Sequence, residues 1–344
     1  MASVDVTVRG AGIFGLSVAW ACARRGARVR VVDPYGPGAG SSGGIVGALA
    51  PHVPENWNAK KAFQLDSLLM AEDWWRGVEA AGGVLAGYGR TGRLQPLADA
   101  AAVALAEARA VGAAELWRGQ ADWRVVSEPG AFAPASPTGR WVFDSLTARL
   151  HPARACGALV AALRAVGGEV VDDAPDRGQV VWATGWRGLA DLSEALARPV
   201  GVGVKGQAVL LRHAAVEDPQ VFVDGLHIVP HADGTVAIGS TSEREFGDPV
   251  LTDAQCDALL DRAVAALPLL HGAPVVRRWA GVRPRARSRA PMLGPWPGRA
   301  GRYVANGGFK IGFGMAPKVG EVMADLLLEG VDAIPEGFRV TDNL

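Results

Sequence analysis

The stretch Val4-Asp5-Val6-Thr7-Val8-Arg9-Gly10-Ala11-Gly12-Ile13-Phe14-Gly15 decides the fold. A β-branched segment runs into glycines spaced as Gly-x-Gly-x-x-Gly, and apolar residues at helical spacing follow. This order predicts a strand, a tight turn and a helix. In such a turn Gly10 permits the bend, Gly12 lets a pyrophosphate approach the backbone, and Gly15 lets helix and strand pack closely. The free N–H groups at the start of the helix then face the phosphates.

A second β-branched segment, Val29 to Val32, ends at Asp33. An acid at the end of the second strand is placed to accept hydrogen bonds from adenosine ribose hydroxyls. The loop after it, residues 34–47, is rich in glycine and serine. Such a loop suits a bound cofactor, although small residues are also common in plain loops. The alternative for the whole segment is an ordinary strand–helix–strand unit with a glycine turn.

Composition limits the classes of function. A chain of 344 residues suits two domains, and its 35 basic and 35 acidic residues balance, which argues against a nucleic-acid partner. The three cysteines are far apart, so we expect neither a disulfide framework nor a metal site. No apolar segment is long enough to span a membrane. The N-terminus lacks the pattern of a signal peptide, and we therefore expect a cytoplasmic protein.

The rest of the chain divides into two patterns. Residues 203–242 alternate apolar and polar residues around turns at Asp224-Gly225 and Asp233-Gly234, which predicts antiparallel hairpins and a second domain. Further expectations are helices at 59–81, 98–111 and after Pro152, loops and edge strands at 117–141, a strand at 180–185, a helix opened by a Thr252-x-x-Gln255 capping box, an extended segment at 277–284, a strand at 303–306, a glycine turn and helix from Gly307, and a polar tail at 332–344.

The motif alone does not choose NAD over FAD. Three features favour FAD: the motif lies at the N-terminus, a glycine-serine loop follows Asp33, and a second glycine turn precedes a helix at residues 307–314. A helix N-terminus there would stabilise negative charge on a reduced flavin. The sequence has no Cys-x-x-Cys, so it does not fit flavoproteins that reduce disulfides with NAD(P)H.

The chain resembles the D-amino acid oxidase (DAO) family of FAD-dependent oxidoreductases, in particular its glycine oxidase and sarcosine oxidase branch. The motifs that carry the resemblance are the first glycine turn, Asp33, Ser41-Ser42-Gly43, Ala183-Thr184-Gly185, the segment from Trp279 to Pro284, and Gly308 to Gly312. The resemblance implies an α/β fold with a Rossmann-like FAD-binding domain and a second domain built on an antiparallel sheet. The expected FAD-binding domain comprises residues 1–85, 145–202 and 280–344, and the substrate-binding domain residues 86–144 and 203–279.

FAD is expected to be bound without a covalent link, because all three cysteines fall in helical patterns away from the glycine turns. The expected cofactor-binding residues are Gly10, Ala11, Gly12, Ile13, Phe14, Gly15, Asp33, Pro34, Ser41, Ser42, Gly43, Val46, Gly47, Ala183, Thr184, Gly185, Gly308, Phe309, Lys310, Ile311 and Gly312.

Four residues are candidates for the substrate end. A guanidinium can hold a carboxylate through two parallel hydrogen bonds, and the resemblance places Arg283 in that role. Lys310, inside the second glycine turn, would hold the carboxylate or stabilise flavin charge. Glycine oxidases carry tyrosine where this chain has His227, whose imidazole could bind substrate or face solvent. His52 follows the glycine-serine loop and could line the site. Arg9 needs a partner, which a carboxylate of the tail could supply, and Arg285, Arg287 and Arg289 suggest a solvated face.

These expectations point to oxidation of a small amino acid or secondary amine by hydride transfer to flavin, followed by hydrolysis of the imine, with oxygen or another electron acceptor reoxidising the flavin. A more specific hypothesis is a glycine oxidase that supplies thiazole synthesis for thiamine. The alternatives are a D-amino acid dehydrogenase, an enzyme that oxidises a carboxymethylaminomethyl group on tRNA uridine, and a non-catalytic flavoprotein scaffold. The oligomeric state is left open.

Overall fold

Two large sheets organise the chain, and the computed structural model describes residues 4–344, so that residues 1–3 of the first predicted domain lie outside it. The first sheet has six strands in the order β15-β16-β9-β1-β2-β8, parallel except for the β15–β16 pair. Its central strands are buried on both faces, as their continuous β-branched runs require. The bounds are β1 (Val6–Arg9), β2 (Val29–Val32), β8 (Glu169–Val171), β9 (Gln179–Trp182), β15 (Met292–Pro295) and β16 (Arg302–Asn306).

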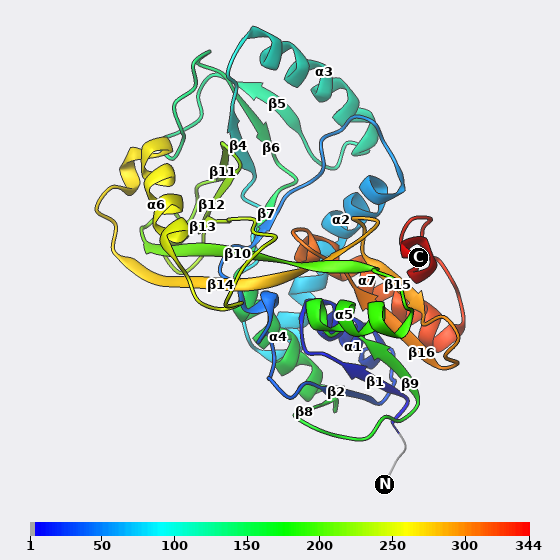
Figure 1. Cartoon of the computed structure of the whole chain (residues 1–344). Coiled ribbons are helices and arrows are strands. Elements are labelled where there is room, and N and C mark those ends of the chain that lie inside the picture. The colour runs from blue at the N-terminus through cyan, green and yellow to red at the C-terminus, as the bar shows by residue number, and fades with distance from the viewer. Residues whose placement is uncertain (1–3) are drawn as a thin grey trace.

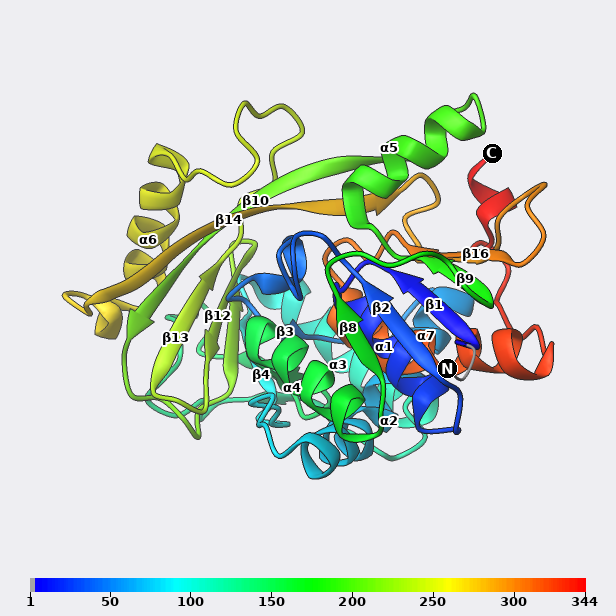
Figure 2. The same ribbon diagram turned by 90° about the horizontal axis from the view of Figure 1, so that it is seen from below.

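Helices cover both faces of this sheet. α1 (Ile13–Ala23), α2 (Ala59–Gly82), α4 (Pro152–Ala165) and α7 (Gly312–Ala324) pack against one another on one face. Figure 2 shows α5 (Gly185–Ala195) on the opposite side of β1 and β9, where it also contacts the second sheet. α1 is buried along its whole length because it is almost entirely apolar.

The second sheet has eight strands in the order β14-β10-β13-β12-β11-β4-β6-β5 and is antiparallel except for the β11–β4 pair. It confirms the predicted hairpins, with Asp224 and Gly225 at positive φ values of 49° and 76° between β11 and β12. α6 (Ala254–Ala266) covers one face and α3 (Ala100–Leu116) contacts β5 (Figure 1). The bounds are β4 (Arg93–Pro96), β5 (Trp123–Val126), β6 (Trp141–Asp144), β10 (Gly201–Arg212), β11 (Gln220–Val223), β12 (Leu226–Pro230), β13 (Thr235–Gly239) and β14 (Val275–Ala286).

The DAO-type fold that the sequence predicted is therefore present: a mainly parallel sheet beside a mainly antiparallel one. Strands β10 and β14 pair from Gly201 with Ala286 to Leu211 with Val275. They cross the predicted domain limits at 202/203 and 279/280 without interruption, so those limits stay a prediction. A short pair, β3 (Ala48–Leu49) with β7 (Ala148–Arg149), connects the layers.

Two local predictions are wrong. The cap of α6 is Asp253, whose carboxylate accepts a hydrogen bond from the Gln255 backbone N–H, rather than Thr252, because the helix begins one residue later than expected. The C-terminal segment is not a purely polar tail. Phe338 is buried against Phe63, with ring centroids 4.9 Å apart, and its carbonyl accepts a hydrogen bond from the Leu293 N–H of β15.

Candidate functional site

The first glycine turn leaves no room for side chains where strand, turn and helix meet. Gly10 has a φ of 107°, and a Cβ placed there would lie 2.4 Å from the Ala183 carbonyl oxygen. A Cβ on Gly15 would lie 1.9 Å from the carbonyl oxygen of Gly10. At Gly12 the nearest neighbour of such an atom is the Ser42 hydroxyl, 3.2 Å away. The turn is thus packed at Gly10 and Gly15 and open at Gly12, the distribution expected of a pyrophosphate-binding turn.

Asp33 and Ser42 fix the shape of this turn. One carboxylate oxygen of Asp33 accepts a hydrogen bond of 2.8 Å from the Ala11 N–H, and the other accepts one of 3.0 Å from the Tyr35 N–H. The hydroxyl of Ser42 accepts a hydrogen bond of 3.0 Å from the Ile13 N–H at the start of α1. The carboxylate keeps further lone pairs for hydroxyl donors in the adjoining cavity.

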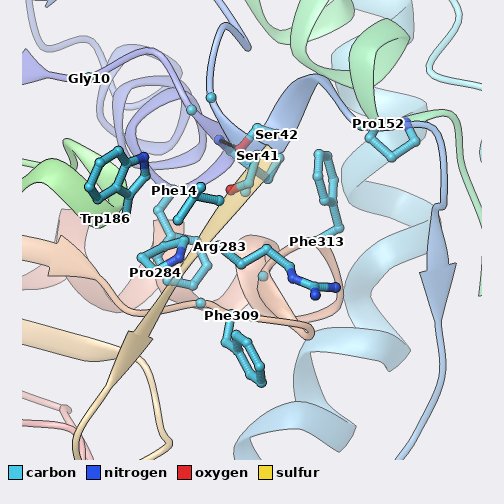
Figure 3. Close-up of a pocket in the computed structure, with 18 of the residues that line it drawn as sticks. Gly10, Phe14, Ser41, Ser42, Pro152, Trp186, Arg283, Pro284, Phe309 and Phe313 are labelled. Atoms are coloured by element: carbon cyan, nitrogen blue, oxygen red, sulfur yellow. Dashed lines mark hydrogen bonds between the residues drawn. The ribbon is translucent and has the colours of Figure 1, made fainter. Parts of the chain in front are cut away.

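A cavity of about 1050 Å³ runs from this turn to the second glycine turn. Figure 3 shows Gly10, Ser41 and Ser42 along one side of it and Arg283, Pro284 and Phe309 along the other. Four predicted cofactor-binding residues, Ala11, Gly15, Gly43 and Ile311, are not on its wall. Those that line it are Gly10, Gly12, Ile13, Phe14, Asp33, Pro34, Ser41, Ser42, Val46, Gly47, Ala183, Thr184, Gly185, Gly308, Phe309, Lys310 and Gly312.

Arg283 lies on β14, half-buried in the wall, and its guanidinium is held by the protein. Nη1 donates a hydrogen bond of 2.6 Å to the Ser240 hydroxyl, and Nη2 donates to the carbonyl oxygens of Thr241 (2.7 Å) and Lys205 (3.2 Å). Nε is buried and has no partner among residues 4–344. Burial lowers the pKa of Arg283 to about 10, which nearby Glu243 opposes, so the group stays cationic at neutral pH.

Phe309 carries three cations around its ring. The guanidinium carbon atoms of Arg283 and Arg285 lie 5.5 and 5.6 Å from the ring centroid, and Nζ of Lys310 lies 5.7 Å from it. Lys310 is exposed at the rim of the cavity. Desolvation lowers its pKa, and repulsion by the two arginines lowers it further. The second glycine turn therefore presents concentrated positive charge beside the cavity.

His227 lies on β12 and lines the same cavity, with its ring 4.7 Å from that of Phe222. Burial lowers the pKa of His227 to about 3, assisted by the positive charges of Arg93 and Lys310. Its Nδ1 atom has no hydrogen-bond partner within the described part of the chain. The imidazole is therefore neutral at physiological pH, with one nitrogen available to a ligand.

The structure does not bring His52 to the cavity wall. Its backbone N–H donates a hydrogen bond of 2.8 Å to the Gln64 side-chain oxygen, which also contacts the His52 ring. Arg9 does line the cavity, but the suggested partner in the tail is wrong. Its Nε donates a hydrogen bond of 2.8 Å to Asp176, just before β9, because β1 and β9 are neighbours in the sheet.

Several lining residues were missed from the sequence. Trp279 is one, and its ring covers Gly281, where a Cβ would lie 2.5 Å from the indole. The spacing of two residues on one strand face could have indicated this contact. No local signal pointed to the other additional side chains of the wall, which include Tyr35, Trp186, Arg187, Phe222, Ser240 and Phe313.

Comparison with known proteins agrees with this geometry. A glycine oxidase of Pseudomonas putida is 35% identical over 167 residues, which are 48% of this chain and 45% of that protein, so the match spans just under half of that relative's length. A putative thiamine biosynthesis oxidoreductase, ThiO, of Rhizobium etli is 31% identical over 94% of this chain and 97% of its own length.

In the crystal structure of the Geobacillus kaustophilus glycine oxidase the same fold recurs, with a TM-score of 0.83, 22% identity and coverage of 98% of both chains. Within residues 4–344 no helix has the length and apolar character needed to cross a membrane. The profile of the family described as DAO, FAD dependent oxidoreductase, matches residues 5–326, and the chain belongs to this family.

Proposed function

We propose that the chain is a flavoenzyme that oxidises the C–N bond of a small amino acid or secondary amine, as its glycine oxidase and ThiO relatives suggest. One observation carries this proposal. A single cavity joins a pyrophosphate-type glycine turn to a group of cations beside Phe309. The first end suits a dinucleotide and the second suits a carboxylate.

The residues at the first end fit FAD. A side chain at Gly10 or Gly15 would collide with backbone, whereas Gly12 lines the cavity, and so do Ile13 and Phe14 at the start of α1, where a helix favours an anion. The cavity of about 1050 Å³ is slightly larger than most small-molecule sites, which span about 300–1,000 Å³, and this suits a ligand as large as a dinucleotide. When bound, FAD supplies the acceptor for a hydride ion.

Binding without a covalent link is part of the proposal. Cys22, Cys156 and Cys256 are buried in α1, α4 and α6, and none of them lines the cavity. Burial raises the pKa of Cys22 and of Cys156 to about 12, which keeps both thiols protonated.

At the second end, Arg283 and Lys310 would attract and orient the substrate carboxylate. The neutral imidazole of His227 would hydrogen-bond the amine, and the rings of Phe309 and Phe313 would exclude water. The substrate loses a hydride from its α-carbon and a proton from its nitrogen, and water then converts the imine to a 2-oxo acid and an amine or ammonia. No side-chain base is needed for the carbon centre, because the hydrogen leaves with its electron pair.

An anaerobic substrate panel tests this proposal. Purified protein is mixed with glycine, sarcosine, proline and D-amino acids, and the flavin absorbance is followed. We expect at least one of these amines to bleach the flavin. Arg283→Met and Lys310→Met should keep FAD but lose most of the bleaching, whereas Arg287→Met, which removes an exposed cation from the same basic run, should behave as wild type.

Protein that binds no added FAD, or holoprotein that no amine bleaches, would contradict the proposal, and the second result would favour a scaffold. Hydrogen peroxide release in air would separate an oxidase from a dehydrogenase. The near full-length match to ThiO supports a place in thiamine synthesis. Deleting the gene should then make growth depend on added thiazole.

A further inference from the structure

The ring of Phe309 is surrounded by more positive charge than one amino-acid carboxylate can balance. Arg283, Arg285 and Lys310 each place their charge within 5.7 Å of its centroid. In the part of the chain that the structure describes, neither Arg285 nor Lys310 forms a hydrogen bond or ion pair through its side chain. The three cations therefore lack acidic partners of their own.

The nearest acid does not remove this excess. Glu243 interacts with Arg283 only through its charge, while its carboxylate accepts a hydrogen bond of 3.1 Å from Gln207 and lies 3.9 Å from the buried Lys205 ammonium. Lys205 balances the charge of Glu243. The surroundings of Phe309 thus keep a positive net charge.

Arg285 is the residue that distinguishes this arrangement. It was expected on a solvated face with Arg287 and Arg289, which are exposed. The structure instead half-buries Arg285 against Phe309, because β14 bridges to the second glycine turn between Arg285 and Gly308. A half-buried cation is screened less by solvent than an exposed one, so its field reaches the neighbouring cavity.

We propose that the preferred substrate is an amine bearing two carboxylates, or a carboxylate and another anionic group, rather than a simple monocarboxylic amino acid. One carboxylate would be placed by Arg283 and Lys310, and the second would be favoured by the excess charge to which Arg285 contributes. This inference rests on the proposed function. Arg285 is not on the cavity wall, so it acts through its charge and sets specificity without touching the substrate.

Matched substrate pairs test the inference: alanine with aspartate, both in the L and the D form, and the achiral pair sarcosine with N-(carboxymethyl)glycine. We expect kcat/KM for flavin reduction to be at least about tenfold higher for the dicarboxylic member that matches the site, and the advantage to shrink in about 0.5 M NaCl. Arg285→Met should reduce the advantage at least about threefold and affect the monocarboxylic member less. Arg285→Lys should retain it, and Arg287→Met serves as the matched control.

Three results would overturn the inference: monocarboxylic amines as good as dicarboxylic ones, an advantage that neither salt nor Arg285→Met changes, or an Arg285→Met effect equal for both members. The last would assign Arg285 to stabilising reduced flavin, and a lowered flavin reduction potential in that variant would support this reading. If no amine of either kind reduces the flavin, the proposed function itself fails. If monocarboxylic amines reduce it best, only the further inference fails.

Discussion

The position of Arg283 depends on Gly206 on the paired strand β10, and replacing this glycine tests the role of the guanidinium without replacing Arg283 itself. A Cβ on Gly206 of β10 would lie 2.3 Å from Nη2 and 2.5 Å from Cζ of Arg283. These atoms are the end of a flexible side chain, so Gly206→Ala should displace the guanidinium rather than the backbone. Gly206 has no positive φ, and alanine is compatible with its strand conformation.

The magnitude follows from the bonds that displacement would break. Arg283 donates to Ser240, Thr241 and Lys205 at 2.6, 2.7 and 3.2 Å. A hydrogen bond to a charged group contributes about 1.5–3 kcal/mol, part of which water restores. We expect the misplaced cation to cost about 2–3 kcal/mol of transition-state binding, or roughly 30–150-fold in kcat/KM. The fold should lose little, because alanine is about 0.5–1 kcal/mol better than glycine within a strand.

The assay compares kcat/KM for the best amine with FAD affinity and thermal stability. Gly206→Ala should lower the first and leave the other two near wild type. Gly77→Ala is the matched control, since a Cβ there meets nothing within 4 Å. If kcat/KM of Gly206→Ala stays within about twofold of the wild-type value, the position of the Arg283 guanidinium does not determine substrate binding.

Three further outcomes are expected. Gly15→Ala should destabilise the apoprotein by about 1–3 kcal/mol or more in urea unfolding, because the new Cβ collides with backbone. Gly12→Ala should leave folding nearly intact and weaken FAD binding about tenfold or more, as measured by FAD fluorescence titration. The pKa of His227 falls from 6.5 to about 3 on folding, so the unfolded chain takes up its proton first as pH falls and stability is lost below pH 6.5. Between pH 7 and 5 the apoprotein should lose about 2 kcal/mol more than His227→Leu does in urea unfolding. Acid precipitation should release all the yellow colour into the supernatant, and colour retained in the pellet would indicate a covalent flavin.

Local signals were sufficient for much of the fold. The glycine turn at 10–15 was predictable, because Gly15 has to avoid the carbonyl oxygen of Gly10 within the turn itself, and Gly10 has to avoid the end of the adjoining strand at Ala183. The Asp224-Gly225 hairpin is equally local. Two other predictions failed because the deciding partner is distant in sequence. Arg9 pairs with Asp176 because β9 lies beside β1 in the sheet. The C-terminal segment contributes to the core because Phe338 packs against Phe63.

The positive charge around Phe309 also depends on contacts between residues that are distant in sequence. A period of two along β14 puts Arg283 and Arg285 on one face, and this much could be read from the sequence. The face on which they lie depends on the register with β10. A slip of one residue would turn both arginines to the side that packs against α5. Register in turn follows from the long β10–β14 pairing and from the bridge of Arg285 to Gly308. The cations that we assign to the substrate are therefore a product of strand pairing, and a sequence motif alone could name Arg283 but not the charge that surrounds it.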